Sequence, residues 1–370
     1  MTRDQRIAVD LGARSYEVVV GAGLLARAGA EMAPLLRRPD VVVVTDAHLA
    51  ATPHPSTLQR SLEAAGVACR SIVVPPGEAS KSMAQLGDLL GRLFELGIDR
   101  ATTIVALGGG VLGDLAGFAA AVALRGLDYV QVPTTLLAQV DSAIGGKTGI
   151  NSRYGKNLIG AFHQPRLVLA DVGVLRTLPP RELRAGYAEV VKYGLIDRPE
   201  FFAWLEAHGR EVLAGDPAAQ QHAVVESCRA KAAVVAADER EGGVRALLNL
   251  GHTFAHALET ACGYGDELLH GEAVALGLVL AFDLSVRLGL CPAADAARVR
   301  AHLDAVGLPT TLGAVRSQGF AAEALLAPMA RDKKAAAGRP RFVLTRGIGR
   351  AFAGAEVDPP QLEALLEAAA

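Results

Sequence analysis

The sequence is short of lysine. It has 370 residues, of which 37 are lysine or arginine, and only seven of these are lysine, which leaves 30 arginines. A GC-rich codon usage favours arginine and alanine and explains the scarcity, but it does not explain where the remaining lysines stand. Their positions are Lys81, Lys147, Lys156, Lys192, Lys231, Lys333 and Lys334.

The chain also lacks a surplus of positive charge and a long hydrophobic run. Its formal net charge is −2, and 21% of its residues are charged, which argues against disorder and against general nucleic-acid binding. The most apolar run, residues 115–124, has ten residues, about half of the roughly 20 that span a bilayer. No charged-then-apolar signal begins the sequence. We therefore expect a cytoplasmic enzyme with neither a membrane nor a nucleic-acid partner.

Cysteine is scarce as well. The four cysteines are widely scattered, and no two of them form a Cys-x-x-Cys pair. A disulfide framework or a thiolate zinc site is therefore not expected. We interpret the cysteines as buried small apolar residues in a reducing compartment.

The first half of the chain alternates between short β-branched runs and segments of helical periodicity. This alternation predicts parallel strands in a Rossmann-like, doubly wound α/β sheet, and the near-continuous apolar strands fit a sheet covered on both faces. The expected strands are residues 41–44, 71–74, 102–107, 129–132 and 167–170, with 16–20 as an extra strand. The expected helices between them include residues 57–65 and 83–96.

The pattern changes near Pro179 and Pro180, which mark a boundary. We therefore expect an α/β domain over residues 1–178 and a mainly α-helical domain over residues 179–370. Two extended runs around a Gly-Ile-Gly turn, 341–345 and 350–353, predict a hairpin packed on the helices. The expected helices are residues 181–193, 201–208, 218–237, 248–262, 271–288 and 293–306.

A glycine-rich turn follows the expected strand at 102–107. Gly108, Gly110 and Gly113 satisfy G-x-G-x-x-G between a strand and an apolar helix, where backbone N–H groups could approach a pyrophosphate. Glycines in such turns also serve packing alone, and Asp114 is unusual beside a phosphate. Both interpretations remain open.

Asp46 follows the expected strand at 41–44. A carboxylate there could bind the ribose hydroxyls of a dinucleotide, or it could cap the next helix. The sequence does not separate these two roles.

Two glycine-flanked lysines, Lys147 and Lys156, and the neighbouring Asn157 form a donor-rich loop suited to a phosphorylated, hydroxylated ligand. The Gly-Gly-Lys-Thr segment resembles the end of a P-loop. The first glycine of that pattern would have to stand at Asp141, however, so an ATPase is disfavoured.

Histidines and carboxylates suggest a metal site. His252 and His256, four residues apart, share one helical face and could bind zinc together, but the residue after the first histidine is threonine, which disfavours a zincin hydrolase. Glu189 and His270 are further ligand candidates, and Lys192 lies close to the first of them. Three ligands would leave coordination positions open for substrate, as in catalytic sites.

Four other basic residues carry no strong signal by themselves. Lys231 in a helix and Arg245 in a turn are each explained by surface charge, and Lys333 with Lys334 looks like an exposed charge run.

Taken together and in this order, the motifs resemble the dehydroquinate synthase family of the sugar-phosphate cyclase superfamily. The resemblance covers about residues 41–334. Its motifs are GGGVLGDLAGFAAA, RG at Arg125, QVPTTLLAQVDSAIGGKTGIN, GKNLIGAFHQP, LPPRELRAGYAEVVKYG, NLGHTFAHALE, HGEAVALG and DKK. Departures are Ala143, where family members commonly have serine, and the varied loop at 75–81.

The resemblance implies a usually dimeric enzyme with NAD on the α/β domain and zinc or cobalt in the helical domain. It implies Glu189, His252 and His270 as metal ligands, and it makes His256 a catalytic, substrate-contacting residue instead of a ligand. The implied NAD contacts are Asp46, Gly77, Glu78, Lys81, Gly110, Val111, Leu112, Gly113, Asp114, Thr134, Thr135, Lys147, Lys156, Val174, Leu175, Arg176 and Thr177. The implied catalytic and substrate contacts are Arg125 (across the dimer interface), Asp141, Lys147, Lys156, Asn157, Lys192, Lys231, Arg245, Asn249, His256, and one of Lys333 and Lys334.

The resemblance further implies conversion of 3-deoxy-D-arabino-heptulosonate 7-phosphate, a phosphorylated sugar acid, to 3-dehydroquinate and phosphate, a lyase step of the shikimate pathway. NAD would oxidise C5 transiently, phosphate would leave by β-elimination, and re-reduction and an aldol reaction would close the ring. The alternatives are a sister cyclase making valiolone- or deoxyinosose-type rings, a metal-dependent polyol dehydrogenase, and a degenerate homologue used as a binding module. All seven lysines fall in family motifs, and we interpret them as sites where a compact ammonium fits and the planar arginine fork does not.

Overall fold

The computed structural model describes residues 3–316, 320–330 and 341–369; Lys333 and Lys334 lie outside these ranges. The chain forms two compact units. Unit 1 comprises Met1–Pro179 and Gly215–Arg240, and unit 2 comprises Pro180–Ala214 and Glu241–Ala370. The chain thus passes between the units three times, because helix α8 (Pro217–Ala237) packs on strands of unit 1. The expected division into an NAD-binding domain before residue 179 and a metal- and substrate-binding domain after it remains a prediction.

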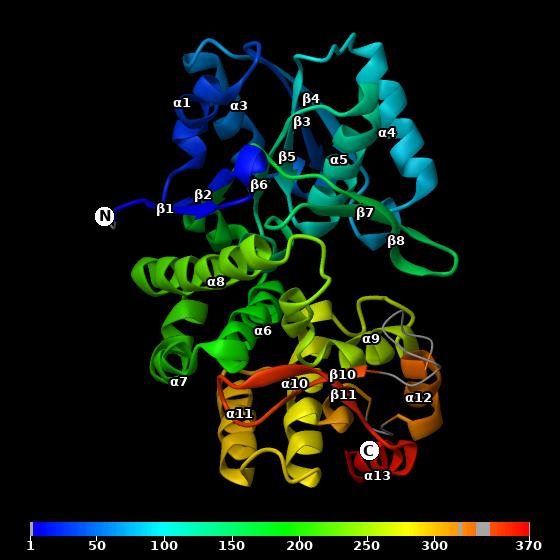
Figure 1. The fold of residues 1–370 in the computed structure, drawn as a ribbon. Helices are drawn as coiled ribbons and strands as arrows, with labels where there is room; N and C mark the ends of the chain where they lie inside the picture. The colour runs from blue at the N-terminus through cyan, green and yellow to red at the C-terminus, as the bar shows by residue number, and fades with distance from the viewer. Residues whose placement is uncertain (1–2, 317–319, 331–340, 370) are drawn as a thin grey trace. The chain divides into compact units, whose positions relative to one another are not determined.

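A seven-stranded sheet forms the centre of unit 1 (Figure 1). Its order is β1-β2-β9-β6-β5-β3-β4; β1 is antiparallel to β2 and the other neighbours are parallel. Each of the six strands expected from β-branched runs is present. The bounds are β1 (Gln5–Val9), β2 (Tyr16–Gly21), β3 (Asp40–Asp46), β4 (Ala68–Val74), β5 (Thr103–Gly108), β6 (Tyr129–Pro133) and β9 (Leu167–Asp171).

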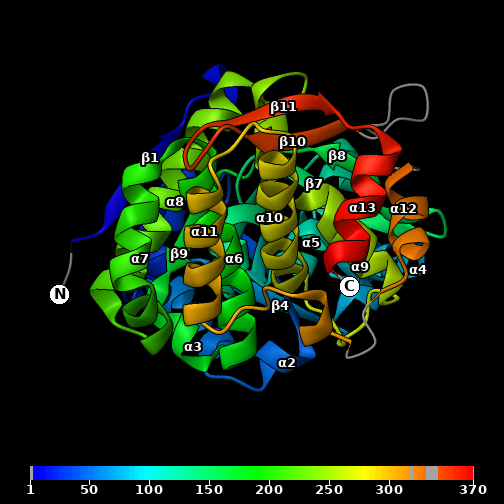
Figure 2. The same cartoon turned by 90° about the horizontal axis from the view of Figure 1, so that it is seen from below.

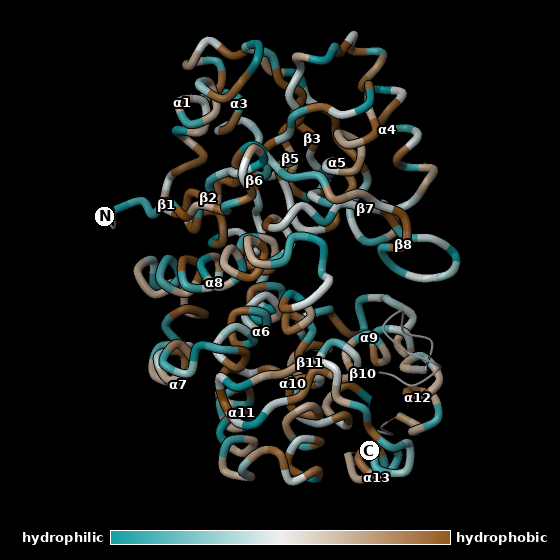
Figure 3. Tube along the Cα trace, viewed as in Figure 1, coloured by the Kyte–Doolittle hydropathy of each residue, from teal (hydrophilic) through white to brown (hydrophobic). Residues whose placement is uncertain are grey.

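Helices cover both faces of this sheet, as a doubly wound fold requires. Because side chains alternate along a strand, Val41 and Val43 of β3 pack with α1 and α3, whereas Val42 and Val44 pack with α4 and α5. Figure 3 shows much of the trace around β3 and β5 at the hydrophobic end of the scale. The helices are α1 (Ala28–Met32), α2 (Ala47–Ala50), α3 (His54–Ala64), α4 (Met83–Glu95), α5 (Gly110–Val122) and α8.

A separate antiparallel hairpin, β7 (Lys147–Ser152) and β8 (Gly155–Phe162), stands where the sequence suggested a loop. Gly149 faces Gly160 across the hairpin, and a Cβ on Gly160 would lie 2.1 Å from the carbonyl oxygen of Thr148. The glycines that resembled loop residues therefore permit close strand pairing.

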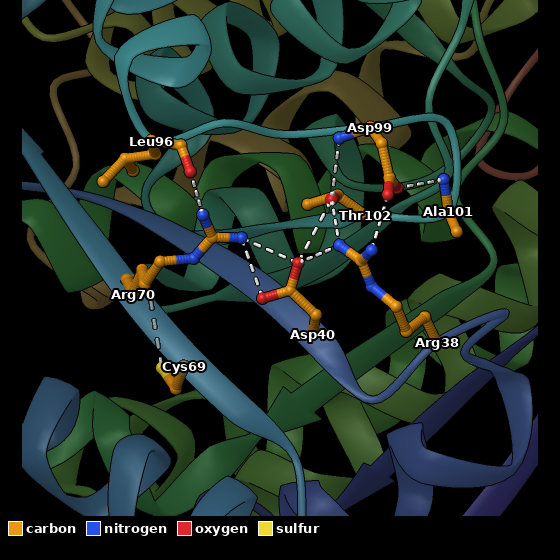
Figure 4. A network of polar contacts seen from close by, with 8 residues as sticks. All are labelled: Arg38, Asp40, Cys69, Arg70, Leu96, Asp99, Ala101 and Thr102. Carbon is orange, nitrogen blue, oxygen red and sulfur yellow. Dashed lines mark hydrogen bonds and ion pairs between the residues drawn. The ribbon is translucent and has the colours of Figure 1, made fainter.

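A network of polar contacts ties together the N-terminal ends of β3, β4 and β5 (Figure 4). Oδ2 of Asp40 lies 2.7 Å from nitrogens of both Arg38 and Arg70 and accepts a hydrogen bond from Thr102. Burial alone would raise the pKa of Asp40, but the two arginines lower it. This network braces the sheet at the edge opposite the glycine-rich turn.

Unit 2 is mainly helical. The buried helix α10 packs against α6, α9 and α11, and against strand β10 of a hairpin; Figure 2 shows α10 beside α11. This confirms the expected hairpin on the helices. The bounds are α6 (Pro180–Asp197), α7 (Pro199–Ala214), α9 (His252–Ala261), α10 (His270–Arg287), α11 (Ala293–Ala305), α12 (Ala322–Ala330), α13 (Pro359–Ala369), β10 (Arg341–Thr345) and β11 (Ala351–Glu356).

The helix expected over residues 248–262 begins later than predicted. A short helix, η8 (Val244–Asn249), precedes it, and Gly251 at φ +79° breaks the path before α9 starts at His252. The remaining short helices are η1 (Gly12–Arg14), η2 (Leu25–Arg27), η3 (Ala33–Leu35), η4 (Glu78–Ser80), η5 (Ala123–Arg125), η6 (Ala138–Ser142, a π-helix), η7 (Val172–Thr177) and η9 (Leu312–Ala314).

Two expected absences can be compared with the structure. Within the described residues, no helix has the length and apolarity to cross a membrane. All four cysteines are free; Cys228 and Cys291 are buried, and Cys69 and Cys262 are half-buried. The interpretation of the cysteines as buried residues therefore holds for two of the four.

Candidate functional site

Unit 2 gathers three metal-binding side chains from three helices. Glu189 comes from α6, and His252 and His270 are the first residues of α9 and α10. One ligand atom from each lies within 4.8 Å of the others. The Nε2 atoms of both histidines are 3.4 Å from Oε1 of Glu189. The three candidates predicted from the sequence are therefore adjacent, and their role as ligands remains a proposal.

Glycines bring these helices close together. A Cβ on Gly271 would lie 1.8 Å from the carbonyl oxygen of Ala185 on α6, and one on Gly277 would lie 2.1 Å from the carbonyl oxygen of Gly251. Neither position has room for a side chain. Helix α10 thus approaches α6 and the start of α9 at backbone distance, which aims the three polar side chains at one point.

The buried cluster is charged. Glu189 and Lys192 are each 1% exposed, and their Oε2 and Nζ atoms are 2.5 Å apart. Burial alone would raise the pKa of Glu189, but Lys192 and His252 hold it well below its usual range. Burial and Lys192 lower the pKa of His252. An ionised carboxylate and a neutral imidazole are the forms that bind metal ions.

Oε1 of Glu189 also fits a metal. It is buried and has no hydrogen-bond partner among the described residues, and the two histidine nitrogens that face it are 3.4 Å away. A carboxylate oxygen and two imidazole nitrogens match the N/O ligand sets of catalytic zinc and of cobalt.

Each ligand candidate histidine has a second contact through its other ring nitrogen. Nδ1 of His252 lies 3.2 Å from the carbonyl oxygen of Leu250, and Nδ1 of His270 lies 3.3 Å from Oε2 of Glu259. Burial alone would lower the pKa of His270, but Glu189 and Glu259 raise it to about 10. The sequence analysis missed Glu259, although it stands seven residues after His252, two turns along the same helix.

The histidine pair suggested by spacing is not the one in the cluster. His256 is exposed, and its ring centroid is 5.6 Å from that of His252. Arg245, explained from sequence as surface charge, is instead 1% exposed. Asn249 donates a hydrogen bond to Glu241 (2.9 Å).

In unit 1, Lys231 is buried and its Nζ lies 2.7 Å from Oδ1 of Asp141. The surface interpretation of Lys231 is therefore wrong. Asp141 belongs to the π-helix η6, a form of helix often found at functional sites. The two residues come from elements 90 positions apart.

A second buried lysine links the glycine-rich turn to the β7–β8 hairpin. Nζ of Lys81 lies 2.6 Å from Oδ2 of Asp114 and 2.5 Å from Oδ1 of Asn157. Asn151 donates a hydrogen bond to Glu78 (2.6 Å) beside them. The unusual carboxylate at Asp114 thus has a structural partner: burial raises its pKa, and Lys81 only partly offsets this.

Most of the residues predicted to contact NAD lie at the C-terminal edge of the sheet. Asp46 ends β3, and the others follow β4 (Gly77 to Lys81), β5 (Gly110 to Asp114), β6 (Thr134, Thr135) and β9 (Val174 to Thr177); Lys147 and Lys156 belong instead to the β7–β8 hairpin. Ligands of open α/β sheets bind at this edge. The individual contacts remain predictions.

Local geometry also gives some of these residues structural roles. Asp46 caps α2 by accepting a hydrogen bond from the Leu49 N–H (2.9 Å). A Cβ on Gly110 would lie 2.8 Å from Oγ of Ser142. Thr177 lies 2.7 Å from Nε2 of His54, a buried residue whose pKa is lowered by burial and which the sequence analysis missed.

The remaining predicted basic residues are more accessible. Lys147 on β7 is exposed, and Lys156 on β8 is half-buried with Nζ 4.0 Å from Glu78. Arg125 is exposed at φ +66°, next to Leu124 at φ +49°. Left-handed backbone at consecutive non-glycine residues is costly and is typical of functional sites.

Comparisons with known proteins agree with this arrangement. Residues 71–185 match the 3-dehydroquinate synthase N-terminal family and residues 186–335 the 3-dehydroquinate synthase C-terminal family. A 3-dehydroquinate synthase of Rhodospirillum rubrum is 63% identical over 98% of this chain and 94% of its own.

Two solved structures are similar over nearly the whole chain. A 2-epi-5-epi-valiolone synthase from Streptomyces hygroscopicus subsp. jinggangensis, with NAD+ and Zn2+ bound, has a TM-score of 0.86 and 32% identity, covering 95% of this chain and 96% of its own. A 2-deoxy-scyllo-inosose synthase complexed with carbaglucose-6-phosphate, NAD+ and Co2+ has a TM-score of 0.84 and 25% identity, covering 99% and 100%. The chain belongs to the 3-dehydroquinate synthase family.

Proposed function

We propose that this protein is a lyase that converts 3-deoxy-D-arabino-heptulosonate 7-phosphate to 3-dehydroquinate and inorganic phosphate. NAD and a zinc or cobalt ion serve as cofactors. The observation that carries the proposal is the buried cluster of Glu189, His252 and His270 with Lys192 beside it, in a chain 63% identical to a curated 3-dehydroquinate synthase.

The cofactors supply the redox chemistry. When bound, NAD would supply reversible hydride transfer without net consumption, and the metal ion would supply Lewis-acid polarisation of the substrate hydroxyl group. The ion would be held by Glu189, His252 and His270. The lowered pKa values of Glu189 and His252 favour the ionised carboxylate and the neutral imidazole, which are the forms that bind a metal ion.

The basic residues bind the phosphorylated substrate. Lys147, Lys156 and Arg245 provide cationic donors for the phosphate dianion and for the charge that develops as it leaves. Lys192, held by Glu189, and Lys231, held by Asp141, each present an ammonium in a fixed position. Preorganised charge of this kind stabilises a transition state without reorganisation.

The proposal extends to assembly and location. We propose a homodimer in which the exposed Arg125 contacts the substrate of the second subunit, as the family resemblance implies. We also propose a biosynthetic role in the shikimate pathway and a cytoplasmic location.

A phosphate-release assay tests the activity. Purified protein with NAD, a divalent metal and the heptulosonate phosphate should release inorganic phosphate without net NADH. No phosphate release with zinc or cobalt present would refute the proposal. Net NADH from a polyol would support a metal-dependent dehydrogenase, and a cyclised product from a different sugar phosphate would support a sister cyclase.

A pair of histidine variants tests the metal site. His270→Ala should lose both activity and bound zinc. His256→Ala is the matched control: the exposed His256 lies outside the cluster, so this variant should keep its zinc and lose activity. Normal zinc content in His270→Ala would remove His270 from the ligand set.

A further inference from the structure

The two histidines of the metal cluster have the same arrangement of ring nitrogens. In each, Nε2 faces Oε1 of Glu189 and Nδ1 faces an oxygen on the other side of the ring. For His252 that oxygen is the carbonyl of Leu250, which can only accept a hydrogen bond. Nδ1 of His252 therefore carries the proton, and its Nε2 lone pair is free to bind an ion.

His270 has a side-chain carboxylate in the place of that carbonyl. Its Nδ1 is 3.3 Å from Oε2 of Glu259, and an ionised carboxylate also only accepts. Glu259 is buried on α9, whereas the His270 side chain is 35% exposed. The His270 ring is half-buried and less enclosed than that of His252, which is 11% exposed, so a polar partner matters more here than at His252.

We propose that Glu259 is a positioning residue of the metal centre: it accepts the Nδ1–H of His270 and so keeps Nε2 directed at the metal. Glu259 is not itself a ligand, because its Oε2 lies at the nitrogen on the opposite side of the ring from Nε2. This inference rests on the proposed metal site. Carboxylate partners of this type orient ligand histidines and raise their basicity.

Three variants of the full-length protein separate positioning from packing. Glu259→Leu removes the acceptor at similar volume, and Glu259→Gln keeps a neutral acceptor. Glu267→Gln is the control, because Glu267 pairs with Arg316 at the surface of the same unit (2.5 Å) and does not contact His270. Zinc affinity is measured by competition with a chromophoric chelator, and the visible spectrum of the cobalt form reports the ligand geometry.

Loss of such a partner costs about 10- to 100-fold in metal affinity. We expect this loss of zinc affinity for Glu259→Leu, and we also expect a changed cobalt spectrum. Since charge-assisted hydrogen bonds are about twice as strong as neutral ones, Glu259→Gln should lose about 3- to 10-fold. Glu267→Gln should bind zinc like the wild type.

The outcomes distinguish this inference from the metal site on which it rests. If His270→Ala loses its zinc but both Glu259 variants keep wild-type affinity and spectrum, the positioning role is wrong and the metal site stands. A lower melting temperature for Glu259→Leu with wild-type zinc affinity in that same variant would likewise reduce Glu259 to a packing residue. If the wild-type protein binds no zinc or cobalt, the proposed metal site itself fails.

Discussion

The buried ion pair of Lys192 and Glu189 allows a quantitative prediction. Lys192→Met keeps the length of the side chain and removes its ammonium group. Glu189, 1% exposed, would then keep its charge without the cation 2.5 Å away. Breaking a buried pair by removing one partner costs about 3–5 kcal/mol in the free energy of unfolding.

The neighbouring His270 determines whether Lys192→Met loses stability at the lower or the upper end of this range of unfolding free energies. Its pKa is raised to about 10, so in metal-free protein at pH 7 it remains as a cation near Glu189. This partial compensation favours the lower end, about 3 kcal/mol. With an unfolding entropy of about 2.1 cal/mol/K per residue over the 370 residues, the melting temperature should fall by about 4 °C.

Lys231→Met is the matched control, because it removes the same group from a similar ion pair. Nζ of Lys231 is 2.7 Å from Asp141, but the Asp141 side chain is 26% exposed, so water can solvate the carboxylate left behind. We expect a loss of about 1–2 kcal/mol. The double variant Glu189→Gln/Lys192→Met, which removes both charges, should recover most of the stability.

Urea unfolding, with a chelator present to keep the protein metal-free, measures the free energy of unfolding of the wild type, the two single lysine variants and the double variant. The reasoning is refuted if Lys192→Met loses no more stability than Lys231→Met, or if the double variant is less stable than Lys192→Met. Either result would mean that the charge of Glu189 is not confined to a water-poor site.

Other predictions concern packing, pH dependence and the braced edge of the sheet. Gly271→Ala should cost several kcal/mol in the free energy of unfolding and lower zinc binding, because its Cβ would lie 1.8 Å from the Ala185 carbonyl oxygen; thermal melts and metal analysis check this. The buried His302, 3.1 Å from the Tyr187 hydroxyl, has its pKa lowered from 6.5 to about 4 by burial. Between pH 6.5 and 4 the unfolded chain therefore binds a proton that the folded protein does not. The free energy of unfolding should fall by up to about 3 kcal/mol as the pH drops through this range. In urea unfolding, His302→Gln should lose less stability over the same pH range than the wild type. Asp40→Asn should lose about 1–3 kcal/mol with unchanged activity per folded molecule, since its network lies at the sheet edge away from the predicted cofactor residues.

Much of the sheet was predictable because its signal is local. The parallel strands contain short apolar runs rich in β-branched residues, and each was identified. Strand β1 was not: its five residues, QRIAV, are only half buried, and an arginine interrupts them. The β7–β8 hairpin was missed because its lysines and glycines look like a loop, and only the pairing of Gly149 with Gly160 explains why glycine suits a strand there.

The candidate site was less predictable, because burial and partners depend on distant parts of the chain. Lys231 looked like surface charge, and only its contact with Asp141 shows why it is buried. Spacing alone grouped His252 with His256, but the close approach of α10 places His270 in the cluster instead. That approach depends on glycine contacts between helices, which no periodicity within one helix reveals.

The scarce lysines gain a physical explanation from these contacts. Of the five lysines in the described part of the chain, three are buried, and each lies 2.5 to 2.7 Å from one carboxylate: Lys81 with Asp114, Lys192 with Glu189 and Lys231 with Asp141. An ammonium group has three donors, whereas a guanidinium has five in a rigid fork. Arginine in the same space would bury more donors than a single carboxylate can satisfy, and each unsatisfied donor costs about 1–3 kcal/mol. Codon usage can therefore replace lysine by arginine at a solvated surface, but burial beside a single carboxylate opposes the replacement at these three positions.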